Sequence, residues 1–336
     1  MKTLDNIGIT PAPDFERLRQ TLSRRGRPGF APFYELYVNP GVMEKLLDKK
    51  IQGRADTLEF YHRAGYDYVP AWPGLPLRRG NMGDSAGDHP IGDWRSFEAY
   101  PWPTTDDITF DEFDALAPKL PDGMKVIGQT GGIFEALESL CGYSTLCYLL
   151  CDARDLVAAI LDHLEALYVA MYTGMARLDT VGALVVSDDL GFKTQTLIAP
   201  DDLRELVLPR HKKLVDIAHA HGKPCILHSC GNLQSIMDDI IGTVGIDAKH
   251  SYEDAILPVA EAKRLYGDRI AILGGFDVDR LCRSSAAEVA VYTERLLADC
   301  ADGGYALGSG NSIADYVPTD NYLSMLETGW RFNHGV

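Results

Sequence analysis

The stretch KPCILHSCG at residues 223–231 shows most clearly which kind of fold the chain adopts. It places the short apolar run CIL directly before a polar end, HSC, and a glycine. A short apolar run with such boundaries is typical of a buried parallel strand, which lacks strict alternation of polar and apolar residues. The same composition recurs at 245–251 (GIDAKHS), 269–277 (RIAILGGFD) and 304–312 (GYALGSGNS). These segments predict a parallel sheet.

Upstream of this stretch, the same kind of pattern predicts strands at 30–38, 66–72, 124–132 and 183–191. Helix-like stretches separate the segments, and parallel neighbours need such helical crossovers. Eight strand–helix units predict a (β/α)8 barrel of the TIM type. An open doubly wound sheet is the alternative; a G-x-G-x-x-G after the first strand would favour it, and the chain has none there.

One segment interrupts this rhythm between the second and third strands. Residues 73–121 are rich in Pro, Gly, Asp and Trp, and a loop this long in a compact domain is usually functional or disordered. Aromatic side chains such as Trp94, Phe97 and Trp102 favour an ordered lid or active-site wall over a surface excursion without a role. We therefore predict a single domain, 1–336, with this long insertion after the second strand.

The bulk composition limits the classes of partner. With 46% hydrophobic residues in 336, the chain can bury the core of a globular protein. A net charge of -16 argues against nucleic acid and against an acidic membrane surface as the main partner. No apolar run approaches the length of a membrane span, and the N-terminus lacks the apolar core of a signal peptide. We therefore expect a cytoplasmic protein.

The seven cysteines are interpreted as reduced thiols, because no secretory signal is visible. Five of them lie in helix-like stretches and are expected to be small, buried apolar residues. These five are Cys141, Cys147, Cys151, Cys282 and Cys300.

Polar side chains gather at the carboxyl ends of the predicted strands, whereas the strand middles are apolar. In a (β/α)8 barrel the catalytic groups stand at that end. The residues in question are Glu35, Tyr37, Gln129, Thr130, Asp188, Asp189, His228, Cys230, His250, Glu253, Asp254, Asp277, Ser309 and Asn311.

His228 and Cys230 are two residues apart on a strand, so their side chains point to the same side. An imidazole and a thiolate on one face supply two of the ligands that zinc prefers. The alternative is a core histidine bonded to the backbone beside a buried cysteine.

Carboxylates at neighbouring strand ends form the predicted catalytic set. Asp188 and Asp189 are adjacent, so we expect one to face the pocket and the other a helix end. Two close carboxylates can separate in pKa and supply a general acid or base, while capping or a salt bridge is the open alternative. Glu253 either joins this set or caps the helix that begins near Leu257. Asn311, at the end of the last strand, completes the set.

Four residues are predicted to contact a cofactor or ligand. Gly275 and Asp277 belong to the segment GGFD, where glycine permits a close approach of the backbone to a ligand. Gln129 and Ser309 stand at the ends of the third and eighth predicted strands.

The segment HSCGNLQSIMDDIIGTVGIDAKHSYED resembles the uroporphyrinogen decarboxylase (URO-D) superfamily, which includes zinc-dependent cobalamin:thiol methyltransferases. The similarity continues through AKRLYGDRIAILGGFDVDRL and GYALGSGNSIADYVPTDNY. It is specific over residues 185–327 and loose before them. The resemblance implies a distorted (β/α)8 barrel, in agreement with the strand count.

The resemblance implies two activities, decarboxylation and methyl transfer. The decarboxylases carry an N-terminal arginine-rich signature and an Asp after the second strand; here that strand ends VPAWPG, without a carboxylate. They also carry a His near the last strand, where this chain has Asn311. The N-terminal basic cluster departs from the signature and consists of Arg17, Arg19, Arg24, Arg25 and Arg27.

The methyltransferase branch holds zinc with His-x-Cys and a later Cys, and His228 and Cys230 match the first two ligands. Zinc lowers the pKa of a bound thiol acceptor, which then takes a methyl group from a corrinoid. The third ligand falls at Asn311 or Ser309, neither a thiol. Another residue must complete the site, and the candidates are Glu35, Asp189, Glu253 and His250.

Three hypotheses follow from these residues and the resemblance. The first is a zinc-dependent methyltransferase that moves a methyl group between a corrinoid or methylated substrate and a thiol, with Glu35 as the first choice of third ligand. The second is a metal-free decarboxylase of a porphyrinogen or another carboxylated substrate. The third is a non-catalytic module that binds a corrinoid or tetrapyrrole. The expected partners are a small-molecule substrate and a corrinoid protein, with a homodimer left open.

Overall fold

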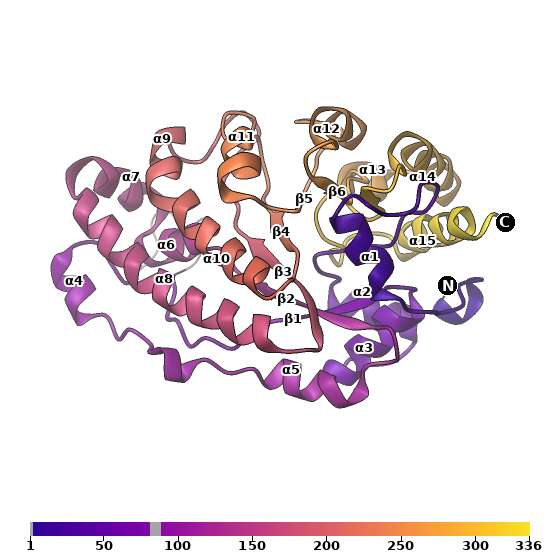
Figure 1. Cartoon of the computed structure of the whole chain (residues 1–336), viewed down its shortest axis with the longest axis horizontal. Helices are drawn as coiled ribbons and strands as arrows, with labels where there is room; N and C mark the ends of the chain where they lie inside the picture. Colours follow the sequence, from indigo (N-terminus) through magenta and orange to yellow (C-terminus); the bar gives the residue numbers. More distant parts are fainter. Residues whose placement is uncertain (1–2, 81–88) are drawn as a thin grey trace.

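The computed structural model describes residues 3–80 and 89–336. Its strands form one curled, parallel sheet of seven, in which each strand pairs with the next one along the chain (Figure 1). The strands are β1 (Tyr68–Ala71), β2 (Lys125–Thr130), β3 (Val181–Ser187), β4 (Cys225–His228), β5 (Ala248–His250), β6 (Ala271–Leu273) and β7 (Tyr305–Ala306). Almost every strand residue is buried, so the core lies on both faces of the sheet. The chain has an α/β fold of the TIM-barrel type.

The helices connect successive strands and cover the outside of the sheet (Figure 1). They are α1 (Phe15–Leu22), α2 (Pro40–Leu47), α3 (Arg54–Arg63), α4 (Trp94–Ala99), α5 (Asp111–Leu116), α6 (Ile133–Cys141), α7 (Tyr143–Asp152), α8 (Arg154–Arg177), α9 (Pro200–Asp202), α10 (Leu208–Ala220), α11 (Met237–Asp239), α12 (Val259–Tyr266), α13 (Val278–Arg283), α14 (Ala286–Cys300) and α15 (Thr319–His334). Because a helical segment follows each of β2 to β6 before the next strand, the parallel order is reached through helical crossovers.

Seven of the eight predicted strands are confirmed, and the first one differs. Segment 30–38 forms only isolated parallel bridges, Phe33 to Leu307 and Val38 to Ile313, beside the end of β7. Within the described residues, no backbone pairing joins this segment to β1. Proline at position 32 cannot donate to a ladder, which weakens pairing along the segment.

A tyrosine side chain takes the place of the missing ladder between segment 30–38 and β1. The Tyr68 hydroxyl accepts a hydrogen bond from the backbone N–H of Glu35 at 2.7 Å and donates to the Glu35 carbonyl at 2.6 Å. Both backbone groups of Glu35 are therefore satisfied without a partner strand. The two ends of the curled sheet meet across this side chain.

Helix α8 is long and apolar enough to cross a membrane by length and composition, with a mean hydropathy of 1.3 over its best window. Our expectation that no apolar run approaches this length is therefore wrong for α8. Half of that window is buried inside the protein, where α8 contacts α6, α10 and β3. The apolar composition of α8 is therefore explained by the face that it packs against the sheet.

The long connection between β1 and β2 carries α4, α5 and short 3-10 turns. Its aromatic cluster packs against the outer surface of α8, since the rings of Phe97 and Trp102 lie 5.2 and 4.7 Å from that of His163. Before this cluster in the chain, the backbone N–H of Ile91 donates to the carbonyl oxygen of Leu140, near the end of α6. Residues 81–88 of this insertion lie outside the described residues. Its role as a lid or wall remains a prediction.

All seven cysteines are free thiols. The expectation that the helical ones are buried is wrong for Cys147 and Cys151, which are exposed, and Cys282 is only partly buried. Cys147 and Cys151 lie one turn apart on α7, so they share one outward face of that helix.

Candidate metal centre

Three neighbouring strand ends bring the central residues of the site together. In the parallel register, Ser187 of β3 pairs with His228 of β4, and His228 pairs with His250 of β5. Asp189 follows β3 by two residues, and Cys230 follows β4 by two residues. Because parallel strands end at the same edge of the sheet, these side chains converge.

His228, Cys230 and Asp189 offer one ligand atom each, and the three atoms lie within 4.8 Å of one another. His228 Nε2 lies 3.6 Å from Cys230 Sγ and 3.7 Å from Asp189 Oδ1. A tetrahedral zinc ion with bonds of about 2.0–2.3 Å keeps its ligands about 3.3–3.8 Å apart. The nitrogen, sulfur and oxygen donors therefore fit zinc in kind, and the two distances from His228 Nε2 fit its spacing. Among the described residues, no other group of three His, Cys, Asp or Glu side chains meets this criterion.

The Cys230 thiol lies next to the Asp189 carboxylate, which also accepts a hydrogen bond of 2.8 Å from the Cys230 backbone N–H. Burial, followed by the neighbouring Asp189 carboxylate, raises the pKa of the Cys230 thiol to about 12. Asn311 Nδ2 and Ser251 Oγ lie 3.1 and 3.5 Å from Sγ and donate to it. Two donors and a carboxylate around one sulfur match a thiolate that shares a cation with the carboxylate.

His228 belongs to a buried chain of hydrogen bonds. Its Nδ1 lies 2.8 Å from Nδ1 of His250, and His250 Nε2 lies 3.1 Å from the carbonyl oxygen of Ser309. Burial lowers the pKa of His228 well below its usual range and that of His250 to about 3. Both rings are therefore neutral at physiological pH, the form in which an imidazole binds a metal.

The two adjacent aspartates have separate surroundings, as the alternation of side chains along an extended segment predicts. Asp188 is fully buried; it accepts hydrogen bonds from the backbone N–H groups of Phe134 and Glu135 at the start of α6. Its Oδ2 also lies 2.7 Å from His211 Nε2. Asp188 therefore faces a helix end, and Asp189 faces the metal-ligand group.

Glu35 does not join the group of His228 and Cys230. Its carboxylate accepts hydrogen bonds from the backbone N–H and the hydroxyl of Ser309, at 2.7 and 2.5 Å. Burial raises the pKa of Glu35 to about 8 and outweighs these two hydrogen bonds, which lower it. Asp189, and not our first choice Glu35, is therefore the carboxylate that lies with His228 and Cys230.

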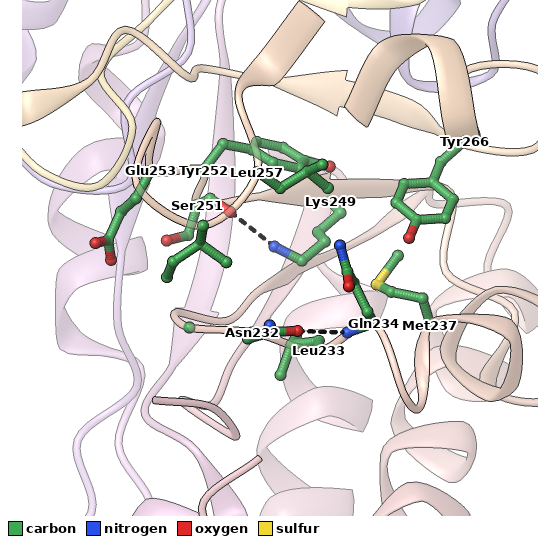
Figure 2. Close-up of a pocket in the computed structure, with 12 residues that line it drawn as sticks. Asn232, Leu233, Gln234, Met237, Lys249, Ser251, Tyr252, Glu253, Leu257 and Tyr266 are labelled. Atoms are coloured by element: carbon green, nitrogen blue, oxygen red, sulfur yellow. Dashed lines mark hydrogen bonds between the residues drawn. The ribbon is translucent and has the colours of Figure 1, made fainter. Parts of the chain in front are cut away.

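A buried lysine holds the two loops that carry the site. Lys249 Nζ donates to the carbonyl oxygens of Ser229, His250 and Ser251 at 3.1, 3.2 and 2.7 Å, and Figure 2 shows its amine pointing toward Ser251. Ser251 has φ = 82°, a conformation that costs free energy in a residue other than glycine. The lysine therefore stabilises the backbone that brings Ser251 to Cys230.

Two cavities border this site. The cavity in Figure 2, lined by Lys249, Ser251, Tyr252 and others, has a volume of about 30 Å³. It has room for a water molecule or two but not for a substrate. A second cavity of about 1040 Å³, which we call the substrate cleft, is lined by Lys193, Glu253, Asp254, Asp277, Arg280, Arg283, Asn311 and Tyr316 among others. One of its lining residues, Asn311, also donates to the Cys230 sulfur and so connects the cleft to the ligand group.

The structure brings three of the predicted residues together along the substrate cleft. Glu253, Asn311 and Asp277 all line it, and Asp277 also caps the start of α13 by accepting from the backbone N–H of Arg280. Glu253 marks the boundary between the two cavities, because it lines both.

The remaining predicted cofactor contacts have partners within the protein. Gln129 is buried and donates from Nε2 to the carbonyl oxygen of Leu36 at 3.0 Å. Gly275 has φ = 93°, and a Cβ atom there would lie 2.4 Å from the Val259 side chain. Glycine is therefore required at position 275 for packing against α12, whether or not a ligand approaches the backbone.

Sequence reasoning missed Lys249, Ser251 and His211. Each stands in a predicted element, and their signals were weak: a lysine inside a buried strand, a serine after His250, and a histidine on an apolar helix face. Only the lysine is unusual enough to have been noticed, because a fully buried lysine needs specific partners.

The N-terminal arginines lie at the other edge of the sheet. Arg17 forms a salt bridge of 2.6 Å with Asp67, the residue before β1. Arg24 donates to the carbonyl oxygen of Asp268, three residues before β6. Both partners mark amino ends of strands, whereas His228 and Cys230 stand at the carboxyl ends. Arg17 and Arg24 are therefore not part of the metal-ligand group.

Comparisons with known proteins place this geometry in context. A family model described as uroporphyrinogen decarboxylase (URO-D) matches residues 85–331. A methyltransferase from Methanosarcina mazei has a similar structure, with a TM-score of 0.70 and 16% identity over 98% of each chain. A B12-independent methionine synthase from Shewanella sp. W3-18-1, in complex with selenomethionine, has a TM-score of 0.53 and 11% identity, covering 92% of this chain and 97% of that one. At such identities the two structures show a shared fold. No curated protein matched the sequence.

Proposed function

The chain belongs to the uroporphyrinogen decarboxylase family, and we propose that within it the protein is a zinc-dependent methyltransferase with a thiol as methyl acceptor. The observation that carries this proposal is the convergence of His228 Nε2, Cys230 Sγ and Asp189 Oδ1 at the carboxyl ends of β4 and β3. Three protein ligands leave a fourth position for an exchangeable thiol, which is the arrangement of catalytic zinc sites.

When bound, zinc would lower the pKa of a coordinated acceptor thiol, so that the thiol reacts as a thiolate at neutral pH. His228, Cys230 and Asp189 would hold the ion. The Asp189 side chain is 38% exposed while that of His228 is 5% exposed, so the group opens toward solvent on the aspartate side. An acceptor thiol can therefore approach without displacing the buried histidine.

The residues of the substrate cleft would complete the reaction. Asn311 donates to Cys230 Sγ and lines the cleft, so it marks the place where an acceptor meets the ligand group. Glu253, a carboxylate on the same wall, is our candidate to accept the proton that the acceptor thiol loses. The methyl group passes to sulfur, and the electron pair of the broken bond stays with the methyl donor. A corrinoid, free or held by a partner protein, is the donor class that we propose.

The alternative is a metal-free decarboxylase of a porphyrinogen or another carboxylated substrate. It would require basic side chains near the catalytic carboxylates to bind the substrate's acidic groups. Arg17 and Arg24 are engaged at the opposite edge of the sheet, but Lys193, Arg280 and Arg283 line the substrate cleft and could bind acidic groups there. Methyl transfer is preferred because the group of His228, Cys230 and Asp189 would hold a metal ion, for which a metal-free decarboxylase has no use.

A methyl-transfer assay tests the proposal. Zinc-loaded protein is incubated with methylcobalamin and a panel of small thiols, and the methyl thioether is quantified by mass spectrometry. We expect thioether formation in the wild type and in the exposed-cysteine control Cys151→Ser, and its loss in Asp189→Asn. Carbon dioxide release from a porphyrinogen panel, without thioether, would instead establish the decarboxylase. Corrinoid binding without turnover on either panel would establish a non-catalytic binding module.

A further inference from the structure

We propose that His250 is a positioning residue that fixes the proton arrangement of His228, so that the bare Nε2 atom of His228 faces Cys230 and Asp189. The inference rests on the proposed function in one respect: the unprotonated Nε2 serves metal binding, because a metal ion requires a nitrogen without a proton. The proton arrangement itself follows from hydrogen-bond geometry in the protein alone.

The argument begins at Ser309, where the direction of one hydrogen bond is unambiguous. His250 Nε2 lies 3.1 Å from the Ser309 carbonyl oxygen. A carbonyl oxygen can only accept, so His250 Nε2 carries the hydrogen. A neutral imidazole has one N–H group, and Nδ1 of His250 is therefore an acceptor.

The same reasoning determines which nitrogen of His228 carries the proton. The two Nδ1 atoms of His228 and His250 lie 2.8 Å apart, and such a contact requires one proton between them. Since His250 Nδ1 accepts, His228 Nδ1 donates. The lone pair of His228 is then left on Nε2, the atom 3.6 Å from Cys230 Sγ and 3.7 Å from Asp189 Oδ1.

Packing holds His250 in this orientation. Its ring lies edge-on to that of Tyr34, with centroids 5.0 Å apart, and the Ser309 backbone is tied to Glu35 through the N–H. Gly274 has φ = 69°, and a Cβ there would lie 2.2 Å from the Ser309 oxygen and 2.8 Å from His250 Nε2. Glycine at this position therefore leaves room for the bond that sets the arrangement. Because His228 and His250 are buried, water does not compete for these atoms.

Nitrogen NMR of the metal-free protein reads the proton arrangement directly. Long-range ¹H–¹⁵N spectra distinguish an Nδ1–H from an Nε2–H imidazole. We expect His228 as the Nδ1–H form and His250 as the Nε2–H form, and His228 as the Nε2–H form would overturn the inference. This readout does not depend on metal binding. Expected tautomers in a protein that binds no ion would support the inference and contradict the proposed function.

Substitutions at His250 test its positioning role through the affinity for cobalt(II), followed by the absorption of the bound ion. His250→Phe keeps an aromatic ring but removes the acceptor nitrogen. We expect the affinity for cobalt(II) to fall by about 10- to 100-fold, as for other residues that orient a metal-binding histidine. His250→Asn retains an acceptor oxygen near the position of Nδ1 and is expected to restore most of the affinity.

Tyr34→Phe is the matched control, because it alters the ring packed on His250 while removing only a hydroxyl that has no hydrogen-bond partner among the described residues. We expect wild-type affinity for cobalt(II) in this variant. Equal affinity in wild type and His250→Phe would overturn the positioning role. Circular dichroism at the same protein concentration verifies that each variant is folded.

Discussion

Asp188 and Asp189 are neighbours in the chain, but their carboxylates meet different chemistry. Asp188 accepts from the first N–H groups of α6 and contacts the buried His211, whereas Asp189 lies beside His228 and Cys230. Adjacent positions on an extended segment point to opposite sides. The split between a carboxylate at a helix end and a carboxylate beside His228 and Cys230 therefore follows from backbone geometry.

This split predicts opposite outcomes for two conservative substitutions. Asp188→Asn replaces an acceptor oxygen with a donor in a fully buried site, and we expect the free energy of unfolding to fall by about 2 kcal/mol. Asp189→Asn is expected to change it by less than about 0.5 kcal/mol, because that side chain is partly exposed, yet to lose metal binding. Urea unfolding and zinc titration of both variants measure the two effects. The reverse assignment would contradict our account of the site.

Glu35 predicts a pH dependence of stability. Burial raises its pKa from 4.5 to about 8, so the folded state keeps the proton at pH values where the unfolded chain has lost it. The resulting stabilisation is complete below about pH 4.5 and is lost as the pH rises through about 8.

Glu35→Gln removes this ionisation while keeping an acceptor for the Ser309 N–H. We expect the free energy of unfolding of the wild type, minus that of the variant, to fall between about pH 5 and pH 8. Urea unfolding at a series of pH values measures this difference. A difference that stays constant or rises with pH would show that Glu35 is ionised in the folded protein.

At the scale of elements, segment 30–38 is attached to β1 by the Tyr68 hydroxyl instead of by a ladder. Tyr68→Phe leaves the buried N–H and C=O of Glu35 without this partner, and we expect a loss of about 2–4 kcal/mol in the free energy of unfolding. Tyr34→Phe removes a buried hydroxyl that has no hydrogen-bond partner in residues 3–80 and 89–336, from a ring 5.8 Å from that of Tyr68. This variant is expected to cost much less. Thermal and urea unfolding of the pair compare the two losses. Equal losses would mean that the Tyr68 hydroxyl does not hold this segment.

The elements also show what a local pattern can and cannot predict. Most of the strands are visible in the sequence as short apolar runs, because a strand buried on both faces is mostly apolar. The exception is β5, whose three residues include the buried Lys249 and His250. Segment 30–38 has the same composition, but its pairing is decided by Pro32 and by the Tyr68 side chain. Tyr68 lies 36 residues after Pro32, so a local pattern does not include it. Likewise, Cys147 and Cys151 are exposed because of the orientation of α7, which composition alone does not reveal.

At the scale of the whole molecule, the placement of His228 and Cys230 followed from the period of a strand and from the carboxyl-end rule for parallel barrels. The choice of the third candidate ligand did not follow from the sequence. Glu35, Asp189, Glu253 and His250 all stand at strand ends, and choosing among them requires distances across the curled sheet. In the fold, Asp189 lies beside Cys230, whereas the Glu35 carboxylate accepts from Ser309. His250 contacts Nδ1 of His228, on the side of the ring away from Cys230.

The zinc content of the protein, purified without added metal, tests the central claim that His228, Cys230 and Asp189 form a metal centre. Inductively coupled plasma mass spectrometry would compare the wild type with Cys230→Ser and with the exposed control Cys151→Ser. We predict about one zinc per chain in the wild type and the control, and none in Cys230→Ser. Absence of zinc from the wild type, or retention of zinc in Cys230→Ser at the wild-type level, would contradict the claim.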